Sequence, residues 1–450
     1  MSEGALEGLA AEVVRQALSR GAADAECTVA EGEEFSATVR MRELERVKEA
    51  GSRGLGLRVL LGRRPGSAYT SDLSADGIAA MIGSALELAG LATEDPHAGL
   101  PEAEDLGAHP GDLRLFHQDV AALEPAVKIG QARAAEEAAF AVDPRIVNSE
   151  GASFSTHVGM RAFANSRGFT GSYRASSCSL GTTPVAREGD SMERDHWYSR
   201  ARSGEALEKP AEVGAIAARR ALRRLNARKV ATQKVPVVFE PLAARSLVGH
   251  IFEAVHGTSV YRRASFLAGK LGERVASEHI TVVDDATLPG LFGTSPFDDE
   301  GAPSRRTVVI DRGVLSSYLL NTYTARKLGL KTTGNASRGI TGNSGVGHGN
   351  LYLERGGQSA EEIVRSVRQG FYVTELLGFG VNIVTGDYSR GAAGLWIENG
   401  ELAYPVSEVT IAGSLARMLM DIEMIGSDLE FRGSVAAPTL LVREMTLSGR

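Results

Sequence analysis

The chain has 450 residues, of which 43% are hydrophobic and 23% charged, a balance typical of a folded globular protein with two or three domains. Its net charge of −7 argues against direct contact with nucleic acid, because nucleic-acid-binding domains usually carry a basic face. The two cysteines, Cys27 and Cys178, are too few for a cysteine-rich zinc site and are typical of free thiols in a reducing compartment.

The sequence of the first 22 residues predicts an amphipathic helix. It does not have the pattern of a targeting segment. The first 22 residues lack a basic region followed by an apolar core. Apolar side chains recur there at helical spacing: Leu6, Leu9, Val13, Val14 and Leu18. No run of about 18 apolar residues occurs in the chain, so no membrane-spanning helix is predicted. We therefore expect a cytoplasmic protein that does not bind membranes.

The first half of the chain is expected to mix strands with long helices. Alternating apolar positions indicate a strand with one buried face: Phe35, Ala37, Val39 and Met41. Three glycines are expected in turns: Gly51, Gly54 and Gly56. Ser74 is placed to cap a helix that runs to about Leu91, and a second long helix is predicted from about Val120 to Val142.

Residues 145–190 carry turn signals at intervals of roughly 8–12 residues, which predicts an antiparallel meander. A helix is expected over 211–227, and the sequence then predicts a domain boundary near residue 230. Residues 233–241 read as a buried strand followed by a helix that begins at Pro241. Asn399-Gly400 lies between two strand patterns and predicts a hairpin turn. Helices are also expected in four ranges: 241–255, 322–328, 359–369 and 412–424.

The predicted fold class is α+β with two domains. Residues 1–230 should form a mixed sheet with long helices. Residues 231–450 should form a β-rich domain with a twisted sheet or barrel-like core and a few helices.

Residues 249–257, GHIFEAVHG, place two histidines and a glutamate in one predicted helix. His250, Glu253 and His256 follow one another at intervals of three residues. On an ideal helix the two histidines are about 120° apart around the axis and about 9 Å apart along it. Zinc-ligating nitrogens lie within about 4 Å of each other. The spacing therefore favours ordinary hydrogen bonds, and a metal site that uses all three residues is the alternative.

Residues 342–350, GNSGVGHGN, lack the Lys-Ser/Thr ending of a phosphate-binding loop and the last glycine of a nucleophile elbow. We interpret this segment as a loop in which Ser344 and His348 are candidate substrate contacts. Tyr388, in the GDYSRGAAG strand region, is a third candidate. The acidic groups at 284–285 and 298–300 are interpreted as turn residues, and acid–base chemistry or a bound cation is the alternative.

Three long segments resemble the TldD/TldE family of peptidases: residues 256–275, 294–336 and 384–415. The resemblance extends over the whole chain and is closest to the TldE branch, also called PmbA or modulator of DNA gyrase. It implies a heterodimer of TldD-like and TldE-like subunits. Such a heterodimer acts as a cytoplasmic metallopeptidase on peptides, for example in microcin maturation. In TldD the metal is held by an H-E-x-x-x-H helix and a cysteine near the C-terminus.

This chain departs from the TldD pattern at both places. Aligned on the downstream segments GERVASE and VVDD, the family's metal motif falls near Leu247 to Phe252, which read LVGHIF. Neither end is a histidine and the second residue is not a glutamate, and residues 430–450 contain no cysteine. A zinc hydrolase needs three protein ligands and an activated water. The resemblance therefore implies a subunit without catalytic residues or a metal of its own, with zinc in the partner.

We accordingly expect the non-metal subunit of a heterodimeric zinc peptidase that degrades or matures peptides. Whether the isolated chain forms a homodimer is left open. One alternative is a binding protein that modulates a client such as DNA gyrase without proteolysis. Another is a stand-alone metallohydrolase that uses His250, Glu253 and His256.

Overall fold

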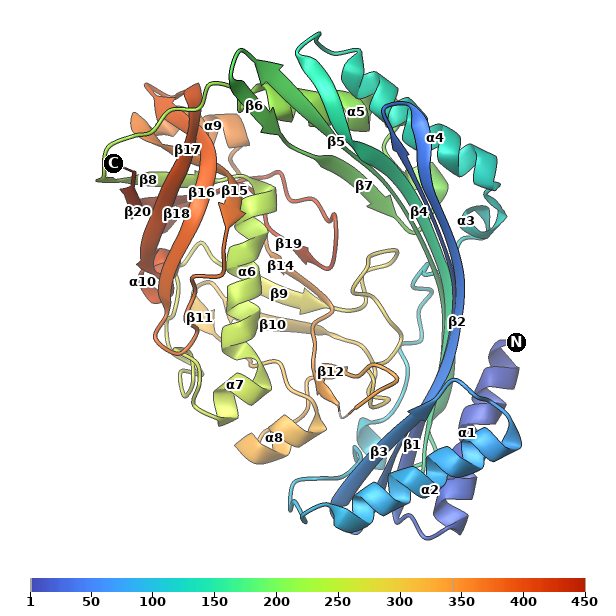
Figure 1. Cartoon of the computed structure of the whole chain (residues 1–450). Helices are drawn as coiled ribbons and strands as arrows, with labels where there is room; N and C mark the ends of the chain where they lie inside the picture. The colour runs from blue at the N-terminus through green and yellow to red at the C-terminus, as the bar shows by residue number, and fades with distance from the viewer. Residues whose placement is uncertain (1, 343, 450) are drawn as a thin grey trace.

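A computed structural model describes residues 2–342 and 344–449 of the chain. Its N-terminal part is built on one long, curved antiparallel sheet that arches beside the rest of the molecule (Figure 1). The strands lie in the order β3-β2-β1-β4-β5-β6, and β7 pairs with β5. The strand bounds are β1 (Asp24–Arg40), β2 (Glu43–Leu61), β3 (Arg64–Thr70), β4 (Ile146–Asn165), β5 (Thr170–Glu188), β6 (Ser191–Arg194) and β7 (Trp197–Ala201).

The central strands are longer than the sequence pattern predicts. β1, β2, β4 and β5 contain 17, 19, 20 and 19 residues. Residues 146–194 form the predicted antiparallel meander as β4, β5 and β6, but with longer strands than the spacing of the turn signals indicates. Small polar residues that resemble turn signals lie inside these strands, because the concave face of the sheet borders a cavity and needs no apolar side chains. Gly51, Gly54 and Gly56 likewise lie inside β2. Met41 lies in the turn before β2 and is 49% exposed.

Helices cover the convex face of this sheet at its two ends (Figure 1). Ser74 caps α2 with its side chain, as the sequence predicts. The single helix expected over 120–142 is wrong: α3 ends at Ala122 and α4 begins at Pro125, because a proline disfavours helical backbone in the residue before it. The helix bounds are α1 (Glu3–Ser19), α2 (Ala75–Leu91), η1 (Ala103–Asp105), α3 (Gln118–Ala122), α4 (Pro125–Phe140), η2 (Gly204–Ala206) and α5 (Pro210–Leu222).

The C-terminal part contains a small closed β-barrel. Its strands follow the order β17-β16-β15-β8-β20-β18, and the pairing of β17 with β20 closes the ring. The β16–β17 hairpin turns at Asn399-Gly400, whose φ angles of 51° and 81° fit the predicted two-residue turn. The strand bounds are β8 (Gln233–Phe239), β15 (Gln369–Leu377), β16 (Asp387–Glu398), β17 (Glu401–Ser414), β18 (Ile422–Ile425) and β20 (Leu440–Ser448).

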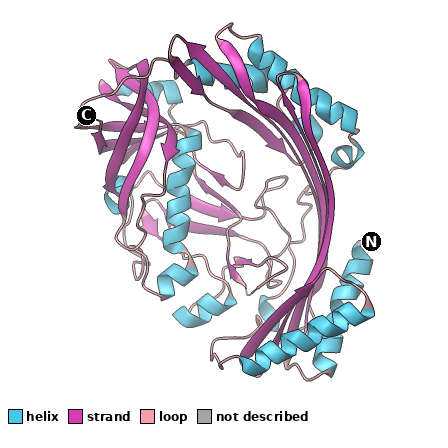
Figure 2. Ribbon diagram, in the orientation of Figure 1, coloured by secondary structure: helices cyan, strands magenta, loops and turns pink. Residues whose placement is uncertain are grey.

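A second sheet in this part has the order β11-β10-β9-β14-β19, and β12 pairs with β13. Its strands are β9 (Val282–Asp285), β10 (Arg306–Asp311), β11 (Val314–Leu315), β14 (Asn350–Leu353) and β19 (Val435–Ala436), and the pair is β12 (Ala336–Ser337) with β13 (Gly345–Val346). The helices are α6 (Pro241–Val255), α7 (Gly257–Tyr261), α8 (Thr322–Leu328), α9 (Ala360–Ser366) and α10 (Leu415–Met420). Largely antiparallel sheets with helices packed against them make up the molecule (Figure 2), so the fold is α+β, as the sequence predicts. Within the described residues, no helix is both long and apolar enough to cross a membrane.

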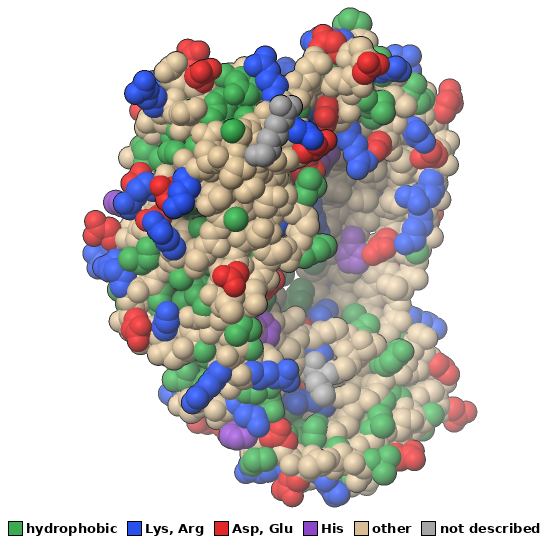
Figure 3. All heavy atoms as spheres, turned by 60° about the vertical axis from the view of Figure 1, so that its left-hand side comes forward, with side chains coloured by type: hydrophobic (Ala, Val, Ile, Leu, Met, Phe, Trp, Pro, Cys, Tyr) green, Lys and Arg blue, Asp and Glu red, His purple; other side chains and the backbone are tan. Residues whose placement is uncertain are grey.

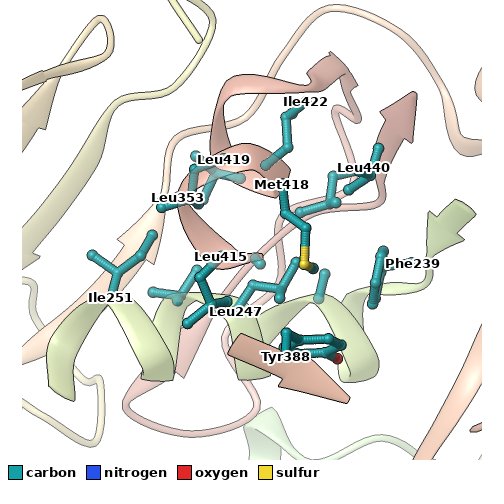
Figure 4. Packing of buried hydrophobic residues seen from close by; sticks show 14 of the residues in the cluster. Phe239, Leu247, Ile251, Leu353, Tyr388, Leu415, Met418, Leu419, Ile422 and Leu440 are labelled. Atoms are coloured by element: carbon teal, nitrogen blue, oxygen red, sulfur yellow. The ribbon is translucent and has the colours of Figure 1, made fainter. Parts of the chain in front are cut away.

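Helix α6 lies against the barrel and carries the central core of the C-terminal part. Leu247 and Ile251 on α6 pack in one cluster with Tyr388 of β16 and Met418 of α10 (Figure 4). The strand and the helix start predicted on either side of Pro241 are both confirmed.

The loop between β12 and β13 joins the two parts. Ile340 packs against Gly54 and Gly56 of β2, and a Cβ added at Gly56 would lie 1.9 Å from the Ile340 carbonyl oxygen. Arg338 of the same loop donates to Glu26 in β1 over 2.6 Å. The two parts also meet elsewhere, for example where Arg432 pairs with Glu208 over 2.6 Å, and a deep hollow lies between them (Figure 3).

Candidate functional site

Helix α6 carries the residues that the resemblance places at the family's metal motif. It begins with Pro241 in its first turn and ends before His256, which terminates the helix in extended conformation. Leu247, Val248 and Ile251 are each less than 5% exposed, so most of the LVGHIF segment faces the core. Buried apolar residues of α6 therefore lie at the positions where the resemblance would require metal ligands.

His250 projects from α6 toward Tyr388 of β16, and its side chain is 16% exposed. Its Nδ1 lies 3.8 Å from Oε2 of Glu253, too far for a hydrogen bond, and neither ring nitrogen has a hydrogen-bond partner. The ring meets Tyr388 edge-to-face, with centroids 6.1 Å apart. Burial lowers the pKa of His250, which favours the neutral ring.

His256 has a different environment and a structural role. Its Nδ1 accepts a hydrogen bond from the Thr258 N–H over 3.2 Å and so caps α7. Burial lowers the pKa of the imidazole, against the opposing effect of the Val346 backbone. His256 therefore holds the junction of α6 and α7 against the glycine-rich loop.

The structure does not bring His250, Glu253 and His256 together as a ligand set. Across residues 2–342 and 344–449, no three His, Cys, Asp or Glu side chains are placed to hold a metal ion. The donor groups within these described residues therefore do not fit a catalytic zinc site, which needs three protein ligands.

The glycine-rich loop is held in place by amide side chains. Asn321 donates to the carbonyl oxygens of Ser344 and Gly345 over 3.3 and 3.0 Å. The Gly347 N–H donates to the Asn335 carbonyl oxygen over 2.7 Å. Asn343 of this segment lies outside the described residues. Over its described residues the loop is thus braced by hydrogen bonds from both sides.

The structure places the three candidate substrate contacts in two locations. Ser344 and His348 lie on the glycine-rich loop and are partly exposed. The His348 ring packs edge-to-face on Phe252 of α6, with centroids 4.8 Å apart, and its Nδ1 lies 2.8 Å from the Gly349 carbonyl oxygen. Tyr388 lies in the core below α6, is 1% exposed, and its hydroxyl has no hydrogen-bond partner.

Asp284 lies next to this loop, although its sequence context indicates only a turn. One carboxylate oxygen accepts a hydrogen bond from Asn335 over 2.7 Å, and the other has no partner. Burial raises the pKa of Asp284 to about 6, against the opposing effects of Asn335 and His348. A buried carboxyl beside an imidazole is a common arrangement at functional sites. The sequence alone does not reveal this pair, because Asp284 lies on β9 and His348 lies in the loop between β13 and β14.

The acidic run at 298–300 stabilises the backbone, in agreement with its interpretation as a turn. Asp298 accepts hydrogen bonds from the N–H groups of Glu300, Ala302 and Ala336, each over 2.9 Å. Asp299 forms an ion pair with Arg161 over 2.8 Å. These carboxylates connect the second sheet to the β12–β13 loop and to the curved sheet.

The concave face of the curved sheet is a polar wall. One cross-strand row of this face contains Lys48, Ser36, Ser155, Ser179 and Arg200. The hydroxyls of Ser155 and Ser179 lie 2.8 Å apart, and the row borders a cavity of about 460 Å³. Serines at alternate positions of β4 and β5 are the sequence signal for this wall, which our sequence analysis did not identify.

The curved sheet, the barrel and the α6 helix together define the class of protein, which the comparisons with known proteins identify as a metallopeptidase family. Family models match three consecutive regions, described as PmbA/TldA metallopeptidase domain 1 (residues 25–89), central domain (118–225) and C-terminal domain (232–449). The chain belongs to the PmbA/TldD metallopeptidase family, as the sequence resemblance predicts.

Curated relatives and solved structures agree with this assignment. The chain is 40% identical to "Metalloprotease PmbA" of Escherichia coli O157:H7, over 96% of this chain and 94% of the relative. It is 36% identical to "Metalloprotease PmbA homolog" of Haemophilus influenzae, over 97% and 96%. A proposed modulator of DNA gyrase from Bacteroides thetaiotaomicron superposes with a TM-score of 0.91 at 29% identity, covering 99% of each chain. TldE from Thermococcus kodakarensis shares the fold, with a TM-score of 0.88 at 22% identity, covering 98% of this chain and 100% of that chain.

Proposed function

We propose that this chain is the non-metal subunit of a heterodimeric zinc metallopeptidase, and that a TldD-like partner supplies the zinc and the general base. The observation that carries the proposal is the composition of α6. Its LVGHIF segment directs apolar residues into the core, and His250 and His256 lie in separate environments. Three protein ligands around one metal are the minimum for zinc hydrolysis, and these side chains do not provide them.

The role of the chain in such an enzyme is to form part of the peptide-binding enclosure. The hollow between the curved sheet and the C-terminal part is bordered by hydroxyl and charged side chains (Figure 3). A polar wall of this kind holds hydrated, unfolded peptide without a strong preference for apolar sequence. Ser344 and His348 on the braced loop are the proposed contacts of this chain with the peptide.

The proposal is tested by reconstitution. The purified chain, a TldD-like subunit and their mixture are each incubated with an unfolded peptide, and cleavage is followed by mass spectrometry. We expect cleavage by the mixture and none by this chain alone. Cleavage by this chain alone, abolished by a zinc chelator, would support the stand-alone hydrolase instead.

His348→Ala is the site-directed variant for the mixture, with His196→Ala as the matched control. The His196 side chain is 57% exposed, stacks on Tyr198 with ring centroids 6.2 Å apart, and has its Nδ1 3.6 Å from Asp195. We expect His348→Ala to raise KM several-fold and to leave kcat nearly unchanged, because the residue contacts peptide and not the metal. An unchanged KM would remove His348 from the peptide contacts.

A further inference from the structure

Strand β2 lacks a neighbour along half of its length. β3 pairs with β2 only over residues 55–61, and β1 occupies the other side. No strand in the described part of the chain pairs with residues 43–54 on the open side. Open strand edges are usually short or covered, because their unpaired backbone groups accept another strand. An open edge of this length can therefore pair with the backbone of another strand.

The register shows which backbone groups face the open side. β2 and β3 are joined by a two-residue turn that Leu61 and Arg64 close, and such a pair exchanges both backbone hydrogen bonds. Along a strand, the backbone N–H and C=O groups of successive residues point alternately to one side and to the other. No bulge interrupts β2 between residues 46 and 61, so this alternation holds there. Val47, Glu49, Gly51 and Arg53 therefore direct their N–H and C=O groups outward, and the even-numbered residues bond to β1.

Both faces of the sheet are hollowed beside this edge. Lys48 borders the cavity of about 460 Å³ on the concave face. Glu49, Gly51 and Arg53 border a cavity of about 720 Å³ on the convex face, which Lys128 of α4 also lines. An added strand places successive side chains on opposite faces. The side chains of an added strand would therefore have space on both faces of the sheet.

The side chains of the edge differ between the two faces. Arg46 and Lys48 lie opposite Thr38 and Ser36, on the concave face, and both are exposed. Lys48 is 3.8 Å from Glu34, but both groups are more than half exposed, so this contact holds Lys48 only weakly. On the convex face Val47 is 48% exposed. The edge thus offers two cations to one face of an added strand, and to the other face it offers Val47 beside Glu49, Gly51 and Arg53.

A second copy of the same edge is a poor partner in the registers centred on its most highly charged stretch, residues 45–49. Two-fold antiparallel pairing of identical strands sets one residue opposite itself. Centring the pair on Glu45, Arg46, Lys48 or Glu49 brings two like charges together. Centring it on Val47 sets Glu45 against Glu49 and Arg46 against Lys48. Like charges directly opposite each other are destabilising, so pairing of two copies is disfavoured when it is centred on residues 45–49. Centring on Gly51 sets Glu49 against Arg53, so pairing of two copies there is the rival outcome, and an increase in mass of the isolated chain that residues 43–53 mediate would contradict the proposal.

We propose that residues 43–53 of β2 bind an extended peptide by strand addition, with a preference for acidic side chains at every second position. The acidic side chains face Arg46 and Lys48, and small apolar side chains between them face Val47. Backbone hydrogen bonds supply the affinity, and the alternating surfaces supply the selectivity. The proposal rests on the role in peptide handling given above. Its test requires neither zinc nor a partner subunit, so the two proposals can fail separately.

The probe is a fluorescein-labelled peptide of alternating Glu and Val, about ten residues long to match the open edge. Binding to the isolated chain is measured by fluorescence anisotropy. We expect the Glu-Val peptide to bind at least about tenfold more tightly than a Lys-Val peptide. N-methylation at every second residue should weaken binding by about tenfold, because it removes backbone donors. Equal binding of the Glu-Val and Lys-Val peptides, or of the methylated and unmethylated forms, would overturn the proposal.

Two sets of variants locate the site. Glu49→Pro removes one outward N–H and leaves the pairing with β1 intact, and Glu49→Gln is its matched control. We expect Glu49→Pro to weaken binding and Glu49→Gln to leave it within twofold. The double variant Arg46→Glu, Lys48→Glu should reverse the preference toward the Lys-Val peptide, and it decides the question if Glu49→Pro fails to fold. An unaltered preference would place the peptide elsewhere. Protection of residues 43–53 from hydrogen exchange only by a partner subunit would make the edge a subunit interface and contradict the proposal.

Discussion

Arg338 and Glu26 are 312 residues apart in sequence, and their side chains meet in a buried ion pair of 2.6 Å. Arg58 donates to the same Glu26 oxygen over 2.8 Å. Glu26 is fully buried, and burial alone would raise its pKa, but the two guanidinium groups lower the pKa below its ordinary value. This cluster joins the curved sheet to the C-terminal part and so helps to fix how the two parts are oriented on either side of the hollow.

Removal of Arg338 should weaken the whole molecule. We predict that Arg338→Ala lowers the free energy of unfolding by about 3–5 kcal/mol, because it leaves a buried charge partly unpaired. Arg167→Ala breaks a pair with Asp24 in which Arg167 is 41% exposed, and should cost about 1 kcal/mol or less. Urea denaturation measures both. A loss below about 1 kcal/mol for Arg338→Ala would show that the cluster does not hold the two parts together.

The contact between β2 and the β12–β13 loop leads to a second prediction. Gly56→Ala should destabilise the protein by about 1–3 kcal/mol, because the new Cβ would overlap the Ile340 backbone. Gly51→Ala in the same strand is the control, since nothing lies within 4 Å of an added Cβ there. The prediction is checked by comparing the melting temperatures of the two variants. Equal melting temperatures would show that Ile340 moves aside without cost.

Local signals in the sequence predicted several elements correctly. Pro241 at the start of α6, Ser74 before α2 and Asn399-Gly400 in the hairpin each fix the backbone through their own chemistry. The apolar face of α6 follows from its helical periodicity. The separation of His250 from His256 has a different origin from the helical angle considered for the sequence, because His256 lies just beyond the end of α6 and caps α7.

The features that the sequence did not predict depend on distant contacts. Gly54 and Gly56 were expected in a turn, but they make room for Ile340, which is more than two hundred residues away in sequence. The long strands β4 and β5 carry serines that face a cavity, so the residue types typical of turns occur inside them. The association of Asp284 with His348 likewise requires the pairing of β9 with β14.

Asp298 should make stability depend on pH. Burial and the neighbouring Glu300 raise the pKa of Asp298 to about 8, even though three backbone N–H groups favour the carboxylate. The unfolded carboxyl titrates near 3.9. The folded protein therefore keeps a proton that the unfolded chain releases, and its stability falls as pH rises from about 4 to about 8. Glu300→Gln removes the neighbouring charge and should flatten this decline. Denaturation at intervals from pH 5 to 9 tests it, and an unchanged slope would exclude the pair as its source.

The unpaired hydroxyl of Tyr388 leads to a fourth prediction. Tyr388→Phe should leave stability unchanged or raise it by about 1 kcal/mol, because the hydroxyl is buried without a partner. Tyr318→Phe is the matched control: its hydroxyl donates to the Leu267 carbonyl and accepts from the Gly269 N–H, each over 2.9 Å, so its loss should cost about 1–2 kcal/mol. Chemical denaturation compares the two variants. A clear loss for Tyr388→Phe would indicate that a buried water pairs with this hydroxyl.

The zinc content of the isolated chain tests the central claim most directly. The purified protein is dialysed against zinc and then against metal-free buffer, and bound metal is measured by elemental mass spectrometry. The proposed role predicts far less than one zinc per chain, with no change in His250→Ala or His256→Ala. One tightly bound zinc per chain, lost in either histidine variant, would contradict it and identify α6 as a metal-binding helix.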